Sequence, residues 1–341
     1  MTVRVGVVGC GQWGQNYLRV LSELDETTFV AACDLRPEVR ARVAARHPSA
    51  EVVADLDALL AQDVDAIVVA TEAQSHFPVV AAALRAGKHV LCEKPLTVAV
   101  DQAMQLAQLA DEQDRILMVG HIFRYNAGVN ALRDAIRSPD FGDVCYLCLV
   151  RTNLGPIRED VNAAWDLAPH DVSIVLHLMH RMPIRVTAQG FSYLRPGRED
   201  VVFITMELPD GVAAHLRVSW LDPRKVREVT VVGRNKMAVL DDVQPVEALR
   251  IYDKGVLQEP SYSSFGEFHH VVRSGEVRIP PIKGDEPLRE QARHFARAVT
   301  EGSRPLSDAW DGARVVAIMD AIDRSLRNSG APTEPVAVPG A

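Results

Sequence analysis

A glycine-rich turn near the N-terminus has the composition needed to bind the phosphates of a dinucleotide. Its residues, Gly9-Cys10-Gly11-Gln12-Trp13-Gly14, form a G-x-G-x-x-G motif. In this motif the first glycine permits a tight turn, the second lets the backbone approach a pyrophosphate, and the third allows close helix–strand packing. The N–H groups and positive end of the next helix would then face the phosphates. The motif is weak alone and becomes informative where it follows a strand and opens a helix.

An acidic residue lies where a contact to the adenosine ribose would be needed. Asp34 comes 20 residues after Gly14, and a carboxylate at that spacing can accept hydrogen bonds from ribose hydroxyls. Because the same carboxylate would repel a 2′-phosphate, Asp34 favours NAD over NADP. Arg36 follows two residues later and could accommodate that phosphate, so NADP stays open as the alternative.

Two further groups could handle a carbonyl oxygen and a proton. Lys94, in Glu93-Lys94-Pro95, follows a predicted strand, where ligands of open parallel sheets bind, and its ammonium group could stabilise an alkoxide. Asp166 and His170 form an Asp-x-x-x-His pair whose side chains share a face if the turn is helical. An imidazole can accept a hydroxyl proton near neutral pH, and a carboxylate can orient it. The simpler interpretation is a helix cap and a packed histidine.

The elements around these residues predict an α/β fold, a doubly wound parallel sheet, over residues 1–122. Continuous apolar runs alternate with helical segments, and such runs are typical of strands buried on both faces. The predicted strands span 2–8, 28–32, 66–70, 89–92 and 117–120, and the main helices span about 12–24, 37–47, 76–86 and 98–113. In this arrangement the glycine turn, Asp34 and Lys94 all follow strand ends.

Residues 123–328 predict a second domain of the α+β class. After a helix at 128–136, short polar turns separate strand-like stretches at 144–152, 185–192, 201–207, 213–219, 228–232 and 237–240. One strong helix at 172–179 interrupts them, and amphipathic helices follow at 287–300 and 311–327. The pattern is typical of a large, mostly antiparallel sheet with one covered face. Residues 329–341, with three prolines and two glycines, predict a flexible tail.

Composition narrows the class of protein. A chain of 341 residues suggests two domains. A net charge of −8 and 6% aromatic residues argue against a nucleic-acid partner, and no apolar run reaches the ~18 residues of a membrane span. The N-terminus has no signal-peptide pattern, and the five cysteines are odd in number and dispersed, which predicts a cytoplasmic protein. Cys145 and Cys148 form a C-x-x-C, but a core strand would place them on opposite faces.

Taken together, these motifs resemble the glucose-fructose oxidoreductase/inositol dehydrogenase (Gfo/Idh/MocA) family. The shared elements are Gly9–Gly14, Asp34, Ala70-Thr71, His76, residues 86–90, Glu93-Lys94-Pro95, Gly120-His121 and Arg124-Tyr125. The resemblance implies an NAD(P)-dependent oxidoreductase of sugars or cyclitols, with Lys94 in the active site and a cis Lys94–Pro95 peptide bond. It further implies a cofactor site that includes Gln12, Trp13, Thr71, His76, Glu93, Pro95 and His121. Family members commonly use the second sheet for oligomerisation, which implies a homodimer or homotetramer.

One stretch departs from the commoner family pattern and suggests a nucleotide-sugar branch. The glycine-rich segment that often precedes Asp-x-x-x-His is here Asn162-Ala163-Ala164-Trp165, and residues 151–162 closely resemble UDP-N-acetylglucosamine 3-dehydrogenases. Arg124, Arg151 and Arg158 could hold a diphosphate through paired donors. The alternative is that these arginines lie at the solvated surface and pair with Glu159 or Asp160. The expected substrate site comprises Lys94, Arg124, Tyr125, Arg151, Arg158, Asn162, Trp165 and His170.

The expected reaction is hydride transfer between nicotinamide and a secondary hydroxyl of a nucleotide-linked sugar, best matched by C3 of UDP-N-acetylglucosamine. His170, oriented by Asp166, would accept the hydroxyl proton while Lys94 stabilises the oxygen, although lysine is the acid/base in some family members. His170, Asp171 and His177 lie close in sequence, but this chemistry requires no metal and we predict none. The alternatives are a free-sugar or inositol dehydrogenase, an NAD-dependent glycosidase, and a ligand-sensing regulator.

Overall fold

The computed structural model describes residues 2–257, 271–273 and 275–339. These residues form two compact units, each discontinuous in sequence. The first comprises residues 1–125, 285–320 and 336–341, and the second comprises residues 126–284 and 321–335. No helix in the described part of the chain combines the length and apolar character needed to span a membrane.

The first unit contains a parallel sheet of six strands in the order β3-β2-β1-β4-β5-β6. The strands are β1 (Val3–Val8), β2 (Thr27–Cys33), β3 (Glu51–Val53), β4 (Ala66–Val69), β5 (His89–Cys92) and β6 (Leu117–Val119). All four residues of β4 are buried, as are the three of β6. Their continuous apolar character follows from a sheet that has helices on both faces, and the predicted fold class is confirmed.

Short connections join these strands to helices. The helices are α1 (Gly14–Glu23), α2 (Pro37–Arg46), α3 (Leu56–Leu60), α4 (Ala73–Arg85) and α5 (Val100–Glu112). Helix α1 buries Tyr17, Leu18 and Leu21 on one face, and this face packs into the core beside Val5 of β1. The helix therefore begins directly after the glycine-rich turn and is fixed to the sheet.

The first unit is completed by a segment from the last fifth of the chain. Helix α8 (Pro287–Glu301) buries Leu288, Ala292 and Phe295 in the same core as Tyr17 of α1. The sequence pattern predicts an amphipathic helix here but assigns it to residues 123–328 as part of the second domain. Because its apolar face fits the surface beside α1, it belongs to the first unit instead. Helix α9 (Ala309–Arg327) begins in the first unit and ends in the second.

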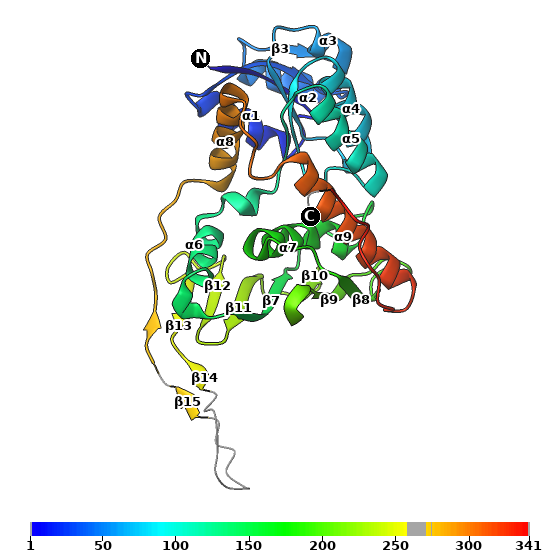
Figure 1. The fold of residues 1–341 in the computed structure, drawn as a ribbon. Helices are drawn as coiled ribbons and strands as arrows, with labels where there is room; N and C mark the ends of the chain where they lie inside the picture. Colours follow the sequence, from blue (N-terminus) through cyan, green and yellow to red (C-terminus); the bar gives the residue numbers. More distant parts are fainter. Residues whose placement is uncertain (1, 258–270, 274, 340–341) are drawn as a thin grey trace, which may run out of the picture. The chain divides into compact units, whose positions relative to one another are not determined.

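The second unit contains a sheet of eight strands in the order β16-β13-β12-β11-β7-β10-β9-β8. These strands are β7 (Val144–Thr152), β8 (Arg185–Phe191), β9 (Val201–Glu207), β10 (Ala213–Ser219), β11 (Val226–Gly233), β12 (Met237–Asp241), β13 (Leu249–Tyr252) and β16 (Val277–Arg278), and β14 (Gly255–Leu257) pairs with β15 (Val271–Arg273) separately. The sheet is antiparallel except where β10 pairs with β7. Helices α6 (Ala127–Ile136) and α7 (Ala163–Met179) cover one face (Figure 1).

Helix α7 is longer than its sequence pattern predicts. The predicted helix spans 172–179, whereas α7 begins at Ala163 and contains Pro169. Asn162 caps its first turn, because the Asn162 side chain accepts a hydrogen bond from the N–H of Trp165. A proline removes one helical hydrogen bond, and the cap and the burial of Ala163, Ala164 and Ala168 offset that loss. Asp166 and His170 therefore lie one turn apart on a regular helix.

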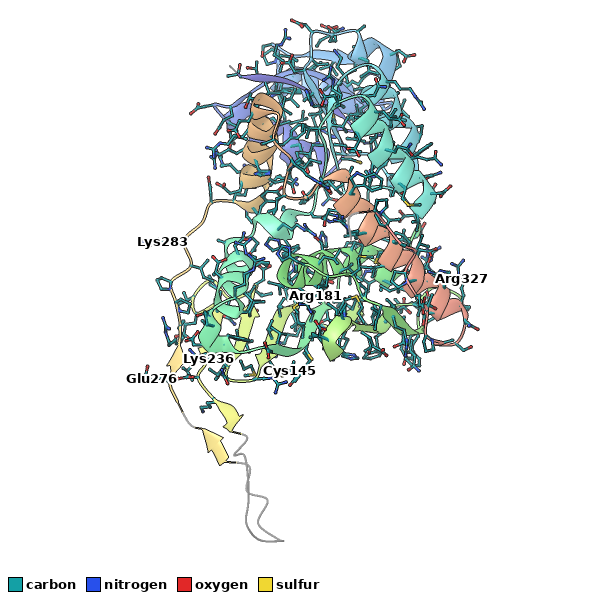
Figure 2. All side chains as sticks on the ribbon, in the orientation of Figure 1. Cys145, Arg181, Lys236, Glu276, Lys283 and Arg327 are labelled. Carbon is teal, nitrogen blue, oxygen red and sulfur yellow. The ribbon has the colours of Figure 1, made fainter. Side chains whose placement is uncertain are left out.

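Two other sequence expectations meet a different local structure. Part of the tail predicted to be flexible makes defined contacts. Thr333 exchanges two backbone hydrogen bonds with Val186, each 2.8 Å long, and Val338 is buried. Cys145 and Cys148 are free thiols on β7 as predicted, but the core interpretation is wrong for Cys145, which lies exposed at the start of the strand (Figure 2). Strand β7 enters the core only from Leu147 onward.

Candidate functional site

The carboxyl ends of the parallel strands bring the predicted cofactor residues to one edge of the first sheet. The glycine-rich turn follows β1, Asp34 follows β2, and residues 70–71 follow β4. Glu93-Lys94-Pro95 follows β5, and Gly120-His121 follows β6. Neighbouring parallel strands end on the same side, so segments far apart in sequence meet at this edge.

Close packing explains two glycines of the turn, and open space surrounds the third. Gly9 has φ +85°, and a Cβ there would lie 2.8 Å from the Ala70 carbonyl oxygen. A Cβ on Gly14 would lie 1.9 Å from the Gly9 carbonyl oxygen. A Cβ on Gly11 would meet only the Arg36 guanidinium, at 3.4 Å. The turn is thus tightly fitted to β4 and α1 and open where a pyrophosphate would approach.

The start of α1 can receive an anion. No side chain caps this helix, and its first turn contains no acidic residue. The backbone N–H groups of a helix start carry a partial positive charge and lack partners within the helix. Gln12 and Trp13 are exposed beside them. These features, together with the open space at Gly11, fit the pyrophosphate of a dinucleotide.

The buried Asp34 pairs with the half-exposed Arg36 next to this turn. Its Oδ2 accepts a hydrogen bond from the Cys10 N–H at 2.9 Å, and its Oδ1 accepts the Arg36 N–H and Nε–H at 3.0 and 3.1 Å. Burial raises the pKa of Asp34, but the hydrogen bonds and charge of Arg36 outweigh it and leave the pKa below its usual value. The carboxylate is ionised and adjoins the turn, as a ribose contact requires.

Lys94 lies in a segment that several buried groups hold in place. The Lys94–Pro95 peptide bond is cis, as the family resemblance implies. His76 lies between this segment and β4, with Nδ1 2.8 Å from the Pro95 oxygen and Nε2 3.1 Å from the Thr71 oxygen. Burial lowers the pKa of His76, so the ring is neutral and, with a single N–H donor, can hydrogen-bond only one of these two carbonyl oxygens at a time.

His121 is an unusual buried histidine. It is 1% exposed, and neither ring nitrogen has a hydrogen-bond partner in the described part of the structure. Burial and the positive charges of Arg124 and Lys94 hold its pKa well below the usual value. A neutral imidazole offers one donor and one acceptor, so His121 remains a predicted cofactor residue with unused hydrogen-bonding capacity.

Arg124 and Tyr125 point into the interior of the first unit. The Arg124 guanidinium pairs with Asp311 at 2.7 Å and donates to the Leu306 carbonyl oxygen at 3.0 Å. The Tyr125 hydroxyl lies 3.2 Å from Ser307 Oγ. Both side chains are buried, so these contacts join the segment after β6 to the first turn of α9 and to the residues just before it.

In the second unit, Asp166 contacts two residues that lie outside α7. Trp220 donates its indole N–H to Asp166 Oδ2 at 3.0 Å, and Arg158 lies 3.5 Å from Oδ1. Trp220 is 1% exposed, and this rigid neighbour fixes the carboxylate. His170 follows one turn later and is half-buried. The orientation of His170 by Asp166 stays a prediction.

The other predicted substrate residues of this unit have protein partners. The buried Arg151 donates Nε–H and NH2 hydrogen bonds to Asp171 Oδ1 at 2.9 and 2.6 Å. Arg158 pairs with Asp160 at 2.6 Å in a half-exposed ion pair. Asn162 caps α7, and the indole of Trp165 donates to Asp323 at 2.9 Å. The arginines would have to give up these partners to bind a diphosphate.

The comparisons with known proteins agree with this architecture. Residues 3–121 match the NAD-binding Rossmann domain of the GFO/IDH/MocA oxidoreductase family, and residues 129–239 match its C-terminal domain. UDP-N-acetylglucosamine 3-dehydrogenase of Acidithiobacillus ferrooxidans is 30% identical over 324 residues, which cover 92% of this chain and 94% of that enzyme. The chain belongs to the GFO/IDH/MocA family. It is an NAD-binding oxidoreductase.

Solved structures of the family have the same fold. The A. ferrooxidans enzyme superposes with a TM-score of 0.83 at 26% identity, over 96% of this chain and 99% of that chain. A protein of gentamicin A biosynthesis, solved with NAD, has a TM-score of 0.83 at 26% identity, over 98% and 97%. An inositol 2-dehydrogenase of Burkholderia multivorans is 28% identical over 99% of this chain and 97% of that enzyme. Family relatives therefore include an enzyme named for a nucleotide sugar and one named for inositol.

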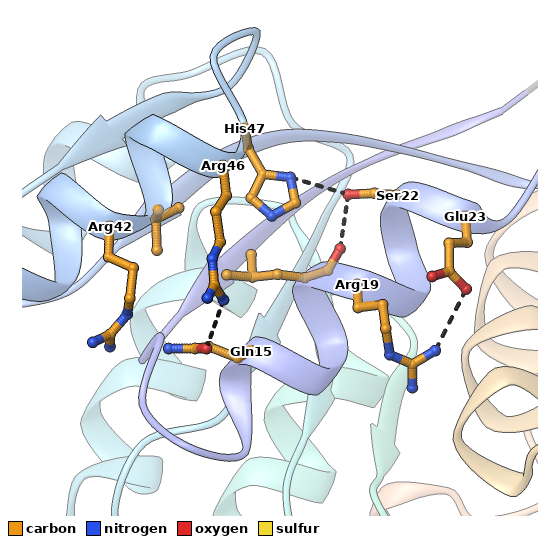
Figure 3. Close-up of a pocket in the computed structure, with 9 residues that line it drawn as sticks. Gln15, Arg19, Ser22, Glu23, Arg42, Arg46 and His47 are labelled. Carbon is orange, nitrogen blue, oxygen red and sulfur yellow. Dashed lines mark hydrogen bonds and ion pairs between the residues drawn. The ribbon is translucent and has the colours of Figure 1, made fainter.

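A surface groove of about 370 Å³ between α1 and α2 lies apart from the family motifs (Figure 3). Two of its arginines have partners within the groove, since Arg46 donates to Gln15 at 3.1 Å and Arg19 pairs with Glu23 at 3.4 Å. His47 lies 3.4 Å from Ser22 Oγ. None of the predicted catalytic or cofactor residues lines this groove, so we do not include it in the site.

Three residues that adjoin the predicted site have no motif to mark them. Tyr17 donates a hydrogen bond to the Glu93 carboxylate, and Gln291 in turn donates one to Tyr17. Trp220 donates a hydrogen bond to Asp166. Tyr17 and Glu93 are 76 positions apart, and Gln291 and Tyr17 are 274 apart. Neither local periodicity nor the family motifs contain information on such pairings.

Proposed function

We propose that this family member is an NAD-dependent dehydrogenase that oxidises a secondary hydroxyl of a sugar, with C3 of UDP-N-acetylglucosamine as the first substrate to test. The redox assignment rests on one observation: the glycine-rich turn, Asp34 and Lys94 follow strand ends at one edge of the first sheet. The choice of sugar rests on 30% identity to a UDP-N-acetylglucosamine 3-dehydrogenase over almost the whole chain.

The chain would contribute binding and proton transfer. Bound NAD supplies the nicotinamide ring that takes up the hydride of the alcohol carbon. Lys94 would stabilise the substrate oxygen as negative charge develops, and His170 would accept the hydroxyl proton. Asp166, fixed by the buried Trp220, would favour the protonated imidazole and set its orientation. The reverse assignment, with Lys94 as the acid/base, uses the same residues.

A specific observation supports a free-sugar or inositol dehydrogenase as the second candidate. Arg124 and Arg151 each pair with a carboxylate in an interior where both partners are largely buried. Breaking such a pair by removing a partner costs about 3–5 kcal/mol, so a diphosphate would have to offset a large loss. Arg158, whose side chain is 40% exposed, is the arginine of this set best able to change partners.

A substrate panel followed by NADH absorbance separates these candidates. UDP-N-acetylglucosamine, a dTDP-sugar, free N-acetylglucosamine, glucose and myo-inositol would be compared, with products identified by mass spectrometry. Preference for the UDP-sugar supports the first proposal, and equal turnover of free sugars or inositol supports the second. Release of an aglycone without net NADH would indicate a glycosidase, and binding without turnover would indicate a regulator.

Two variants test the residue roles. Loss of a general acid/base commonly lowers turnover about 10²–10⁴-fold, and we expect reductions of this size for Lys94→Met and His170→Ala. Calorimetric titration with NAD would check that both variants still bind the cofactor. Near-normal turnover in both variants would remove these residues from the mechanism.

A further inference from the structure

A buried carboxylate with no assigned step in the proposed reaction connects the cofactor turn to the lysine segment. Glu93 is 8% exposed. Its Oε1 accepts hydrogen bonds from the Tyr17 hydroxyl at 2.6 Å and from the Trp13 indole N–H, and its Oε2 accepts the Lys94 N–H at 3.1 Å. Trp13 belongs to the glycine-rich turn. One carboxylate therefore links the residues that would receive the pyrophosphate to the residue that would act on the substrate.

The direction of these hydrogen bonds follows from donor chemistry. The Gln291 side-chain NH2 lies 2.7 Å from the Tyr17 oxygen and can only donate. The Tyr17 oxygen therefore accepts from Gln291, and its own proton is directed to Glu93. Tyr17 and Gln291 are both 0% exposed, so bulk solvent does not reach either side chain. The three direct contacts of Glu93 are all donors, which suits an ionised carboxylate.

Two opposing effects act on the pKa of Glu93. Burial raises this pKa above its usual value, and the hydrogen bonds from Tyr17 and Trp13 and the charge of Lys94 offset only part of that increase. The other titratable groups that face it, Tyr17 and Cys92, are themselves buried, and burial raises the pKa of each well above its usual value. Both stay protonated near neutral pH. Losing one donor would therefore shift the balance toward a neutral Glu93.

The end of β6 leaves room for this carboxylate. A Cβ on Gly120 would lie 3.0 Å from Glu93 Oε1, so glycine avoids a contact tighter than normal packing. Helix α8 delivers Gln291 from the opposite end of the chain. The turn with α1 and the end of β6 thus meet at Glu93, and α8 reaches it through Tyr17.

We propose that Tyr17 and Gln291 are positioning residues, which keep Glu93 an ionised acceptor and thereby hold Trp13 and Lys94 in one fixed arrangement. This inference rests on the proposed role of Lys94 in catalysis. Tyr17 acts through Glu93, and Gln291 acts through Tyr17. The placement of Lys94 relative to the cofactor turn then depends on a network in which the family motifs include Trp13, Glu93 and Lys94 but neither Tyr17 nor Gln291.

The first test removes the Tyr17 hydroxyl. A hydrogen bond to a charged group corresponds to a change of about tenfold or more in a rate, so we expect Tyr17→Phe to lower kcat about tenfold. Because Glu93 becomes easier to protonate, the acid limb of the kcat profile should move to higher pH. Gln291→Met should have a smaller effect, since Tyr17 keeps the proton that it donates to Glu93.

A matched control separates positioning from loss of stability. Thr27→Val removes another buried hydroxyl of the first unit, which donates to the Leu21 carbonyl oxygen at 2.7 Å. It should leave kcat and the acid limb unchanged. The proposal is overturned if Tyr17→Phe keeps kcat within twofold and leaves the acid limb in place, or if Thr27→Val produces the same loss and shift.

A second readout needs neither substrate nor cofactor. The fluorescence of Trp13, obtained as the difference between the wild-type protein and Trp13→Phe, should change as Glu93 is protonated. This step should vanish in Glu93→Gln and move to higher pH in Tyr17→Phe. If Lys94→Met keeps normal turnover, the proposed catalytic role of Lys94 fails, while this titration still reports on the network. A step unmoved by Tyr17→Phe would refute the inference itself.

Discussion

The two units each contain an aspartate paired with an arginine, and the pairs differ in what surrounds them. Asp34 lies at the end of β2 beside the glycine-rich turn, and the side chain of its partner Arg36 is 55% exposed. Asp171 lies on the sheet-facing side of α7, and the side chain of its partner Arg151 is only 6% exposed. A half-exposed partner at a strand end can make way for a ligand. A partner enclosed between a helix and a sheet stabilises the fold.

The largest effect is expected from breaking the enclosed pair. Asp171→Ala leaves Arg151 without this carboxylate, and removing one partner of a buried ion pair costs about 3–5 kcal/mol. The free energy of unfolding, measured with urea, should fall by this amount. Asp160→Ala, which removes the half-exposed partner of Arg158, is the control and should cost no more than about 1 kcal/mol. Equal losses would contradict the contrast between enclosed and exposed pairs.

The pair at the strand end should instead affect cofactor binding. Asp34→Ser removes a charged acceptor for the ribose hydroxyls, and such hydrogen bonds contribute about 1.5–3 kcal/mol. We expect the Kd for NAD to rise at least about tenfold, measured by calorimetric titration. An unchanged Kd would show that Asp34 does not contact the ribose.

The pH dependence of NAD binding tests the role of Arg36. Because Arg36 lowers the pKa of Asp34, the carboxylate stays ionised below the usual range of an aspartate, and its contribution is lost only as the pH falls through that lowered pKa. In Arg36→Ala the pKa of Asp34 should rise, so NAD affinity should begin to fall at a higher pH. The same variant should bind NADP more weakly if Arg36 accommodates a 2′-phosphate. Titrations at several pH values measure both, and an unchanged acid limit would contradict the pairing.

The smallest effect on stability is expected on the uncovered face of the second sheet. Phe203 of β9 is 37% exposed on this face. If the sheet mediates a homodimer or homotetramer, Phe203→Glu should lower the molar mass measured by light scattering and change the unfolding free energy by less than about 0.5 kcal/mol. Val246→Glu, at a loop residue that is 72% exposed, should leave the mass unchanged. An unaltered mass in Phe203→Glu would place any interface elsewhere.

The first sheet is the region that the sequence predicts best. Its strands have continuous apolar runs, and residues such as Asp34 and Lys94 can be placed because strand ends of a parallel sheet share an edge. Local patterns are sufficient there. The fold class, the family and the NAD cofactor are confirmed.

Long-range pairings account for what the sequence does not predict. The sequence pattern predicts this helix only from residue 172, whereas the Asn162 cap and the buried alanines sustain α7 from Ala163 across Pro169. The carboxylate partners of Arg124 and Arg151 come from other elements, so composition around the arginines suggested ligand binding. The catalytic roles of Lys94, Asp166 and His170 stay predictions that the variants above can test.

The return of α8 to the first unit has a consequence for how the protein is synthesised. Residues 1–125 leave the ribosome long before Leu288, Ala292 and Phe295 are translated, yet these three side chains complete the core around Tyr17. Part of the apolar surface of the nascent Rossmann sheet therefore stays uncovered until the second unit and then α8 have been translated. A gene truncated after residue 125 would encode an incomplete core, although the family motifs of the cofactor turn would all be present.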